Sequence, residues 1–146
     1  FKLHLIINDR GELLSFQITP GNVSDVSVTE TLSKGIIGKL FGDKGYISSK
    51  LFNSLIKRGL ELVTTIRKNM KNKLMSLKDK ILLRKRSLIE TVNDQLKNIA
   101  QIEHSRHRSP SNFLVNILGA LIAYSHQEKK PSLSLTPFIK HLPAAN

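Results

Sequence analysis

The stretch KLFGDKGYISSKLFNSLIKRGLELVTTI, residues 39–66, decides the fold because it holds a strand, a helix and a strand in close succession. KLFGD predicts a short strand that ends at Asp43. SSKLFNSLIKRG has the apolar spacing of an amphipathic helix, with Ser48 or Ser49 as its N-cap and Gly59 as its stop. ELVTTI is rich in β-forming residues and predicts the next strand. Asp43 therefore lies between two glycines at a strand end, where it either makes a turn or holds a metal ion.

The same signals divide the rest of the chain. Two strand-like runs flank the turn signal NDRGE, so the chain is expected to open with an antiparallel hairpin. The remaining expected elements, in chain order, are strands over 2–7 and 13–19, a helix over 26–34 capped by Ser24 or Asp25, a long helix over 78–101 and an apolar helix over 112–127. The order strand, strand, helix, strand, helix, strand is typical of a mixed sheet with helices on it, which places the fold in the α/β class.

The excess of positive charge limits the classes of partner that the chain is expected to bind. The chain of 146 residues has 23 Lys and Arg against 11 Asp and Glu, a net charge of +12 that favours a polyanionic partner, nucleic acid before an anionic membrane. The apolar run at 113–123 falls short of the roughly 20 residues that span a bilayer, and no leader suggests secretion. The absence of cysteine excludes disulfides and thiolate metal sites. Residues 67–86 carry nine Lys and Arg and one Asp, and this basic tract either lines a DNA channel or is a solvated linker.

The long helix has an apolar side and a polar side. At 100° per residue its polar side combines five residues, Arg86, Glu90, Asn93, Asp94 and Lys97. One interpretation is a solvated stripe with weak ion pairs. The other is a metal ligand beside a phosphate track, because Glu90 and Asp94 are like charges at i,i+4 and Lys97 lies two turns from Glu90, about 10 Å along the axis.

These residues carry a resemblance to a known family. LRKRSLIETVNDQLK contains R-x3-E-x6-K at Arg86, Glu90 and Lys97, which resembles the helix signature of DDE transposases from bacterial insertion sequences. GDKGY resembles the segment that supplies the second Asp of those enzymes. KLHLIINDRGELLSFQITPGNVSD and QIEHSRHRSPSNFLVNILGALIAY most resemble the 982 family of insertion sequences, and the likeness covers residues 1–135.

The resemblance implies an RNase H-like fold of the retroviral integrase type, with the strand order 3-2-1-4-5. Three acidic residues then hold two Mg²⁺ or Mn²⁺ ions for DNA strand cleavage and strand transfer at the ends of the element. By this match Asp43 and Glu90 are catalytic metal ligands. The resemblance and the basic sequence together nominate six DNA-binding residues, Arg86, Lys97, Lys44, Tyr46, Arg106 and Arg108, of which Tyr46 could equally pack the strand end.

Other properties follow from the same family. The expected partners are double-stranded DNA, both insertion-sequence ends and target, and further copies of the complete chain, with no membrane. The expected location is the bacterial cytoplasm, associated with the nucleoid when bound to DNA.

The chain departs from the family pattern at two places. The helix signature begins with Tyr in the family, where this chain has Leu83. No residue matches the first Asp, because Asp9 and Asp25 come after the second strand of the fold, in turn and cap contexts.

We therefore expect a partial RNase H-like domain over 1–128 that lacks its first strand, an irregular tail over 129–146, and no transposition by this chain alone. The alternatives are a non-catalytic basic nucleic-acid-binding protein, which would bind DNA without divalent ions, and a degenerate transposase remnant.

Overall fold

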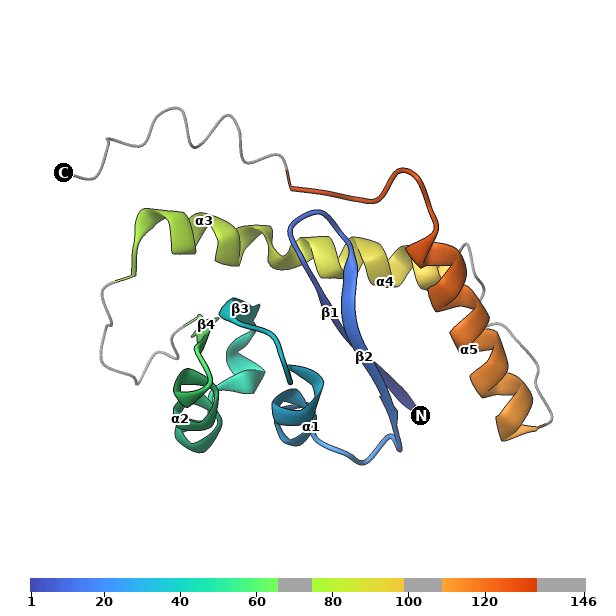
Figure 1. Ribbon diagram of the computed structural model, residues 1–146, viewed down its shortest axis with the longest axis horizontal. Coiled ribbons are helices and arrows are strands. Elements are labelled where there is room, and N and C mark those ends of the chain that lie inside the picture. The colour runs from blue at the N-terminus through green and yellow to red at the C-terminus, as the bar shows by residue number, and fades with distance from the viewer. Residues whose placement is uncertain (66–74, 99–108, 134–146) are drawn as a thin grey trace. The chain divides into compact units, whose positions relative to one another are not determined.

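The computed structural model describes residues 1–65, 75–98 and 109–133 (Figure 1). The chain forms two compact units, and each is described by itself. The first consists of Phe1–Asn8 and Leu13–Ser87, and the second of Asp9–Glu12 and Leu88–Asn146.

The elements follow the expected order. In the first unit they are β1 (Lys2–Ile7), β2 (Leu13–Thr19), α1 (Asp25–Leu32), β3 (Gly38–Gly42), the 3₁₀ turn η1 (Lys44–Tyr46), α2 (Ser49–Lys57), β4 (Leu60–Thr64), α3 (Leu77–Arg84) and the 3₁₀ turn η2 (Lys85–Ser87). In the second unit they are α4 (Leu88–Asn98) and α5 (Pro110–Ser125). The mixed α/β class is confirmed.

The parallel strands β3 and β4 form the centre of the first unit, with Leu40 opposite Leu62 in the register. Side chains alternate across a strand, so one face of this pair presents Leu40, Leu60 and Leu62. Leu60 and Leu62 pack with Leu51 and Leu55 of α2 in one core cluster, in which Leu55 and Leu60 are fully buried. Burial of these four leucines fixes α2 against the β3–β4 pair.

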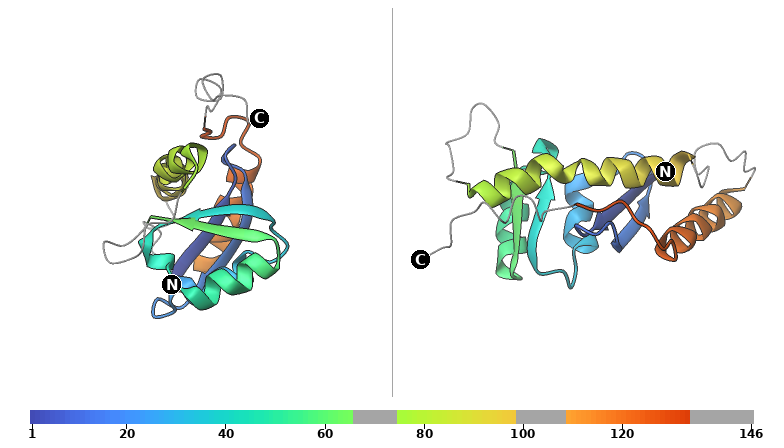
Figure 2. Two further views of the ribbon diagram at one scale, coloured as in Figure 1. Left: turned by 90° about the vertical axis from the view of Figure 1, so that its left-hand side faces the viewer. Right: turned by 90° about the horizontal axis from the view of Figure 1, so that it is seen from above.

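The other face of the β3–β4 pair carries Lys39 and Glu61 beside the apolar Phe41 and Val63, and its Lys39 meets α3. Lys39 Nζ donates to Asp79 Oδ2 at 2.7 Å and lies 3.6 Å from Glu61 Oε2. The Asp79 side chain is mostly buried in the first turn of α3, whose N-cap is Ser76. Because Leu and Lys positions alternate, α2 and α3 lie on opposite faces of the two strands (Figure 2).

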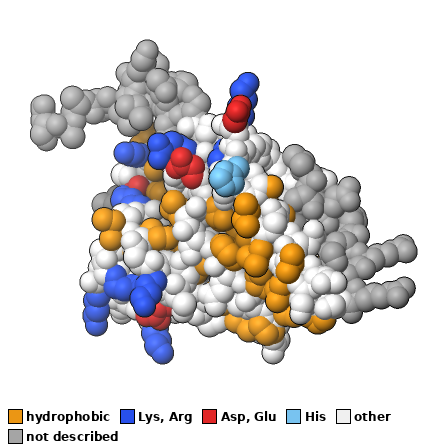
Figure 3. Space-filling model, turned by 45° about the vertical axis from the view of Figure 1, so that its right-hand side comes forward, with side chains coloured by type: hydrophobic (Ala, Val, Ile, Leu, Met, Phe, Trp, Pro, Cys, Tyr) orange, Lys and Arg blue, Asp and Glu red, His pale blue; other side chains and the backbone are white. Residues whose placement is uncertain are grey.

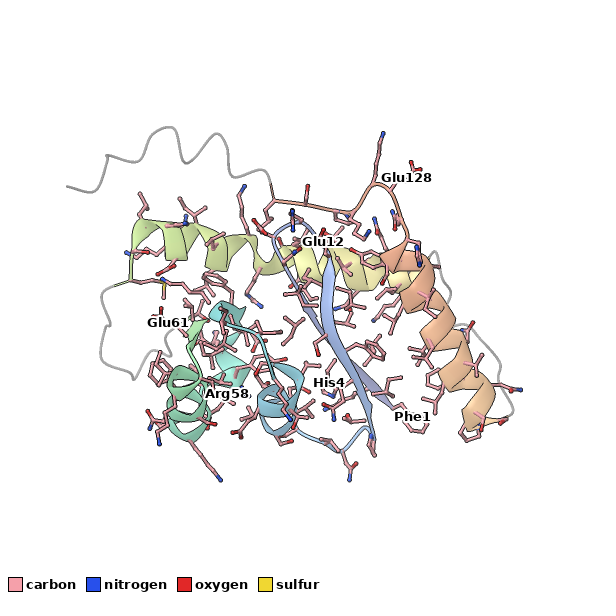
Figure 4. The ribbon with its side chains drawn as sticks, in the orientation of Figure 1. Phe1, His4, Glu12, Arg58, Glu61 and Glu128 are labelled. Carbon is pink, nitrogen blue, oxygen red and sulfur yellow. The ribbon has the colours of Figure 1, made fainter. Side chains whose placement is uncertain are left out.

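Helix α1 joins this centre to the β1–β2 hairpin. Ser24 is its N-cap and accepts a hydrogen bond from the Ser27 amide, which settles the choice between Ser24 and Asp25. Val28 and Leu32 pack with Ile6 of β1 in a second core cluster. At its far end α1 is tied to α2, because Arg58 donates to the carbonyl of Glu30 at 3.2 Å and to Ser33 Oγ at 2.9 Å (Figure 4).

The strands form two sheets where one mixed sheet was expected. Among the described residues, β1 pairs only with β2, antiparallel, and β3 pairs only with β4. Each strand of a two-stranded sheet has one edge without a strand partner. Because no backbone hydrogen bonds join β1 or β2 to β3 or β4 in the described part of the chain, the two pairs remain separate sheets.

The long helix expected over 78–101 is interrupted. The α-helical winding stops at Arg84, passes through the 3₁₀ turn η2, and resumes at Leu88. A 3₁₀ turn has about 3.0 residues per turn, so the 100° spacing used in the sequence does not hold across Arg86. The interpretation that placed Arg86 and Glu90 on one continuous α-helical ridge is therefore wrong.

The second unit is held together by α5. Pro110 begins the helix at a position where its missing amide hydrogen costs nothing. Ile117, Leu121 and Tyr124 are buried, and the Tyr124 hydroxyl donates to the Gly11 carbonyl at 2.6 Å. Gly11 has φ 72°, and a Cβ there would lie 2.0 Å from the Pro131 carbonyl oxygen, so this turn requires glycine.

The pair between Lys39 and Asp79 makes folding stability depend on pH. The hydrogen bond from Lys39 lowers the pKa of Asp79 below its ordinary value of 3.8, and burial opposes this. The ionised carboxylate therefore stabilises the fold above pH 3.8, and the stabilisation is lost as the pH falls through the lower folded pKa. Asp79→Asn should lower the midpoint of urea denaturation at neutral pH, with a loss that shrinks below pH 3.8.

The matched control is Asp94→Asn, which removes an exposed carboxylate from α4. Equal denaturation midpoints for the two variants at every pH would show that the Asp79 pair contributes nothing specific.

Candidate functional site

Asp43 occupies the carboxyl end of β3. Its side chain is exposed and serves as N-cap of η1, where Oδ1 accepts a hydrogen bond from the Gly45 amide at 2.7 Å. Ligand sites in open α/β sheets form at the carboxyl ends of parallel strands. Asp43 thus makes a turn and also presents its carboxylate to solvent, so the two readings of the sequence are compatible.

The two glycines around Asp43 are explained by close contacts. A Cβ on Gly45 would lie 2.9 Å from Asp43 Oδ1, and a Cβ on Gly42 would lie 3.2 Å from the Cδ2 atom of Tyr46. Both glycines therefore leave room for side chains of the same loop. The Gly45 amide, which donates to Asp43 Oδ1, orients the carboxylate.

Tyr46 lies half-buried beside Asp43. Its ring packs against the cluster that contains Leu51 and Leu55. Burial raises the pKa of the Tyr46 hydroxyl, and the carboxylates of Asp25 and Asp43 raise it further. The phenol stays protonated at neutral pH and remains a hydrogen-bond donor, so packing at the strand end leaves a role in DNA contact open.

Asp25 is a neighbour that the sequence did not single out. It begins α1, yet it acts on the same tyrosine hydroxyl as Asp43. Lys2 Nζ lies 3.6 Å and His4 Nδ1 3.7 Å from Asp25 Oδ1, and the other nitrogen of His4, Nε2, lies 2.8 Å from Thr19 Oγ1 (Figure 4). The only sequence feature that could have indicated this cluster was His4 inside a strand-like run, and the sequence alone did not show that Asp25 lies near it.

Glu90 lies in the first turn of α4. Leu88, Val92 and Leu96 bury the opposite side of that helix, while Glu90, Asp94 and Lys97 are exposed, which the apolar pattern predicted. An acidic residue in the first turn and a basic residue in the last turn both complement the helix dipole. This placement alone is compatible with a solvated stripe as well as with a ligand.

The structure distributes the predicted site residues over both units. Asp43, Lys44, Tyr46 and Arg86 belong to the first unit. Glu90 and Lys97 belong to the second. Lys44 and Lys97 are exposed and Arg86 is half-buried, whereas residues 106 and 108 lie outside the described part of the chain.

The donors suit a hard cation. Carboxylate oxygens such as those of Asp43 and Glu90 are the ligands that Mg²⁺ prefers. The described residues contain no group of three or more His, Asp or Glu side chains arranged to hold a metal ion. None of the described helices is long and apolar enough to cross a bilayer.

The contact between Gly45 and Asp43 can be measured as a coupling energy. A methyl group on Gly45 displaces the carboxylate and breaks a hydrogen bond worth about 1 kcal/mol. Gly45→Ala should therefore lower the free energy of unfolding by about 1 kcal/mol more in the wild-type background than in an Asp43→Ala background. Urea denaturation of all four proteins measures this difference. Gly21→Ala is the control, because a Cβ there meets nothing within 4 Å, and it should be additive with Asp43→Ala. Additivity at Gly45 would contradict the orientation of Asp43.

The comparisons with known proteins identify a family for most of the chain. Residues 1–110 match the model of one protein family, described as Transposase DDE domain. No curated protein and no solved structure matches the chain. The matched region includes Asp43, the Glu90 helix and both sheets, and members of this family generally use divalent metal ions and bind DNA. The chain belongs to the DDE transposase domain family, and its role is in DNA transposition.

Proposed function

We propose that this chain is part of a bacterial insertion-sequence transposase, of the 982 type, whose complete form cleaves DNA at the element's ends and joins them to target DNA. The observation that carries the proposal is the exposed Asp43 carboxylate at the carboxyl end of β3, oriented by the Gly45 amide, in a chain of this family.

Asp43 and Glu90 would be metal ligands in this reaction. Two Mg²⁺ or Mn²⁺ ions, when bound, would activate the attacking oxygen and stabilise the leaving oxygen of a phosphodiester. Asp43 contributes a carboxylate held in place by the fold, and Glu90 contributes one from the first turn of α4.

Basic residues would bind the DNA backbone around these carboxylates. Arg86 can hold a phosphate through two hydrogen bonds, and Lys97 acts as a point charge. Lys44 and Tyr46 follow Asp43 directly, so they would contact the strand that is cut. Arg106 and Arg108 would extend the same contact, from a part of the chain outside the described residues. As in other transposition systems that act on paired ends, the complete protein would work as a homo-oligomer.

The separate sheets support an RNase H-like domain that is incomplete over residues 1–128. If a strand pairs with β1 on one side and β3 on the other, the order becomes β2, β1, new strand, β3, β4, which reproduces 3-2-1-4-5. That strand would also carry the first acidic residue, for which this chain has no match. This chain alone is then inactive, because the metal site lacks one of three carboxylates. Most of the irregular tail expected over 129–146 lies outside the described residues, which end at residue 133.

The test is a strand-transfer assay. The protein assayed is a longer product of the same reading frame, which contains both the proposed strand and this chain. With the element's own ends as substrate and Mg²⁺, Asp43→Asn and Glu90→Gln should each reduce the rate at least about 100-fold, because a metal ligand supports several kcal/mol of transition-state stabilisation. Both variants should still bind the DNA, since each loses a negative charge.

Asp94→Asn is the matched control, because it removes an exposed carboxylate one turn further along α4. It should retain strand transfer. Full activity in Glu90→Gln would remove Glu90 from the site. DNA binding without metal-dependent cleavage in the unmodified product would favour a nucleic-acid-binding protein.

A further inference from the structure

Helix α3 and the turn after it carry an excess of positive charge. The basic residues are Lys78, Lys80, Arg84, Lys85 and Arg86, and the single acidic residue is Asp79. Figure 3 shows that Lys and Arg gather in more than one group on the visible surface, so the number of cations alone does not identify a binding surface. What distinguishes α3 is the orientation of its single acidic residue, Asp79.

Asp79 is turned away from solvent. Its side chain is 11% exposed, and Lys39 of β3 neutralises it at 2.7 Å on the inner side of α3. The fold thus removes the one negative charge from the outer surface of the helix. The charged side chains that α3 exposes to solvent are therefore all cationic, namely Lys78, Lys80 and Arg84.

Two of these cations form an unfavourable pair in the free protein. Lys80 and Arg84 are both exposed and lie at i,i+4 on one side of α3, about 6 Å apart along the axis. Like charges at this spacing repel by about 0.2–0.5 kcal/mol. No carboxylate of the described residues forms an ion pair with either side chain. A polyanion would remove the repulsion.

The opposite layer of the unit offers a comparison. Lys34 follows α1 and Lys57 ends α2, and both are exposed, as Lys80 and Arg84 are. Helices α1 and α2, which carry or precede these two lysines, pack on the Leu face of the β3–β4 pair through Val26, Leu51 and Leu55. Helix α3 packs on the opposite face, where Lys39 meets Asp79. The two pairs therefore have equal charge on different faces.

We propose that the outer surface of α3, through Lys80 and Arg84, binds backbone phosphates of duplex DNA without regard to sequence. This inference rests on the proposed function in one respect, which is that the partner is DNA. It adds a contact surface separate from Asp43 and Glu90, and it gives the Lys39–Asp79 pair a second role, which is to keep the surface free of negative charge.

The experiment compares the full chain with two double variants, Lys80→Gln/Arg84→Gln and the control Lys34→Gln/Lys57→Gln. The affinity for a labelled random-sequence duplex is measured by fluorescence anisotropy over a series of salt concentrations. Each phosphate contact contributes about 0.9 to the slope of log K against log salt, so the α3 variant should flatten the slope by about 1.8 while the control leaves it unchanged. Thermal unfolding should match the wild type in both, since all four side chains are exposed.

The outcomes separate this inference from the proposed function. An unchanged slope in the α3 variant, or an equal change in the control, overturns the α3 surface even if Asp43 and Glu90 support strand transfer. A flattened slope supports it even if strand transfer fails. A loss of binding to anionic vesicles but not to DNA would make this a membrane surface and overturn the proposal, and a full chain that binds no duplex at low salt would overturn it together with the DNA partner.

Discussion

The first unit depends on the alternation of side chains along two parallel strands. Leu60 and Leu62 of β4 are buried against α2 and Leu40 of β3 is partly buried in the same cluster, while Lys39 faces α3 and pairs with Asp79. This arrangement fixes the end of β3, and with it the loop in which Asp43 stands between its glycines. The site geometry is thus a consequence of packing two helices on opposite faces of one small sheet.

Strand edges impose the second constraint. β1 and β3 both belong to the first unit, yet they are not hydrogen-bonded to each other, and each has an edge without a strand partner among the described residues. Backbone groups at an open strand edge are available for another strand. The proposed strand would join β1 to β3 in one sheet. The same strand would carry the third acidic ligand, so the sheet and the metal site would be completed together.

Much of the fold could be predicted because its signals are local. Caps such as Ser24 and Ser48 and the stop at Gly59 are read within one turn of chain, and all three act as expected. The separation into two sheets could not be predicted from such signals, since pairing depends on residues distant in sequence. The 3₁₀ turn at Lys85–Ser87 has no glycine or proline to mark it.

The local backbone setting of Asp43 was predictable for the same reason, whereas its role as a metal ligand remains a prediction. Gly-Asp-Lys-Gly indicated either a turn or a metal ligand, and the structure shows the turn at Asp43, with the carboxylate exposed. The proximity of Asp25 to Tyr46 was not predictable, because it arises from tertiary packing of α1 beside η1. The inward pairing of Asp79 was missed similarly, since its partner is 40 residues away.

The central proposal is that Asp43 and Glu90 would be ligands of the same metal ions in the complete protein, and metal-directed cleavage tests it most directly. Fe²⁺ would replace Mg²⁺ in a product that contains the proposed strand, and peroxide with ascorbate would generate hydroxyl radicals at the bound ion. The account predicts backbone cuts beside both Asp43 and Glu90, and the loss of both sets of cuts in Asp43→Asn. Cuts beside only one of the two residues, or cuts beside Glu90 that persist in Asp43→Asn, would contradict it.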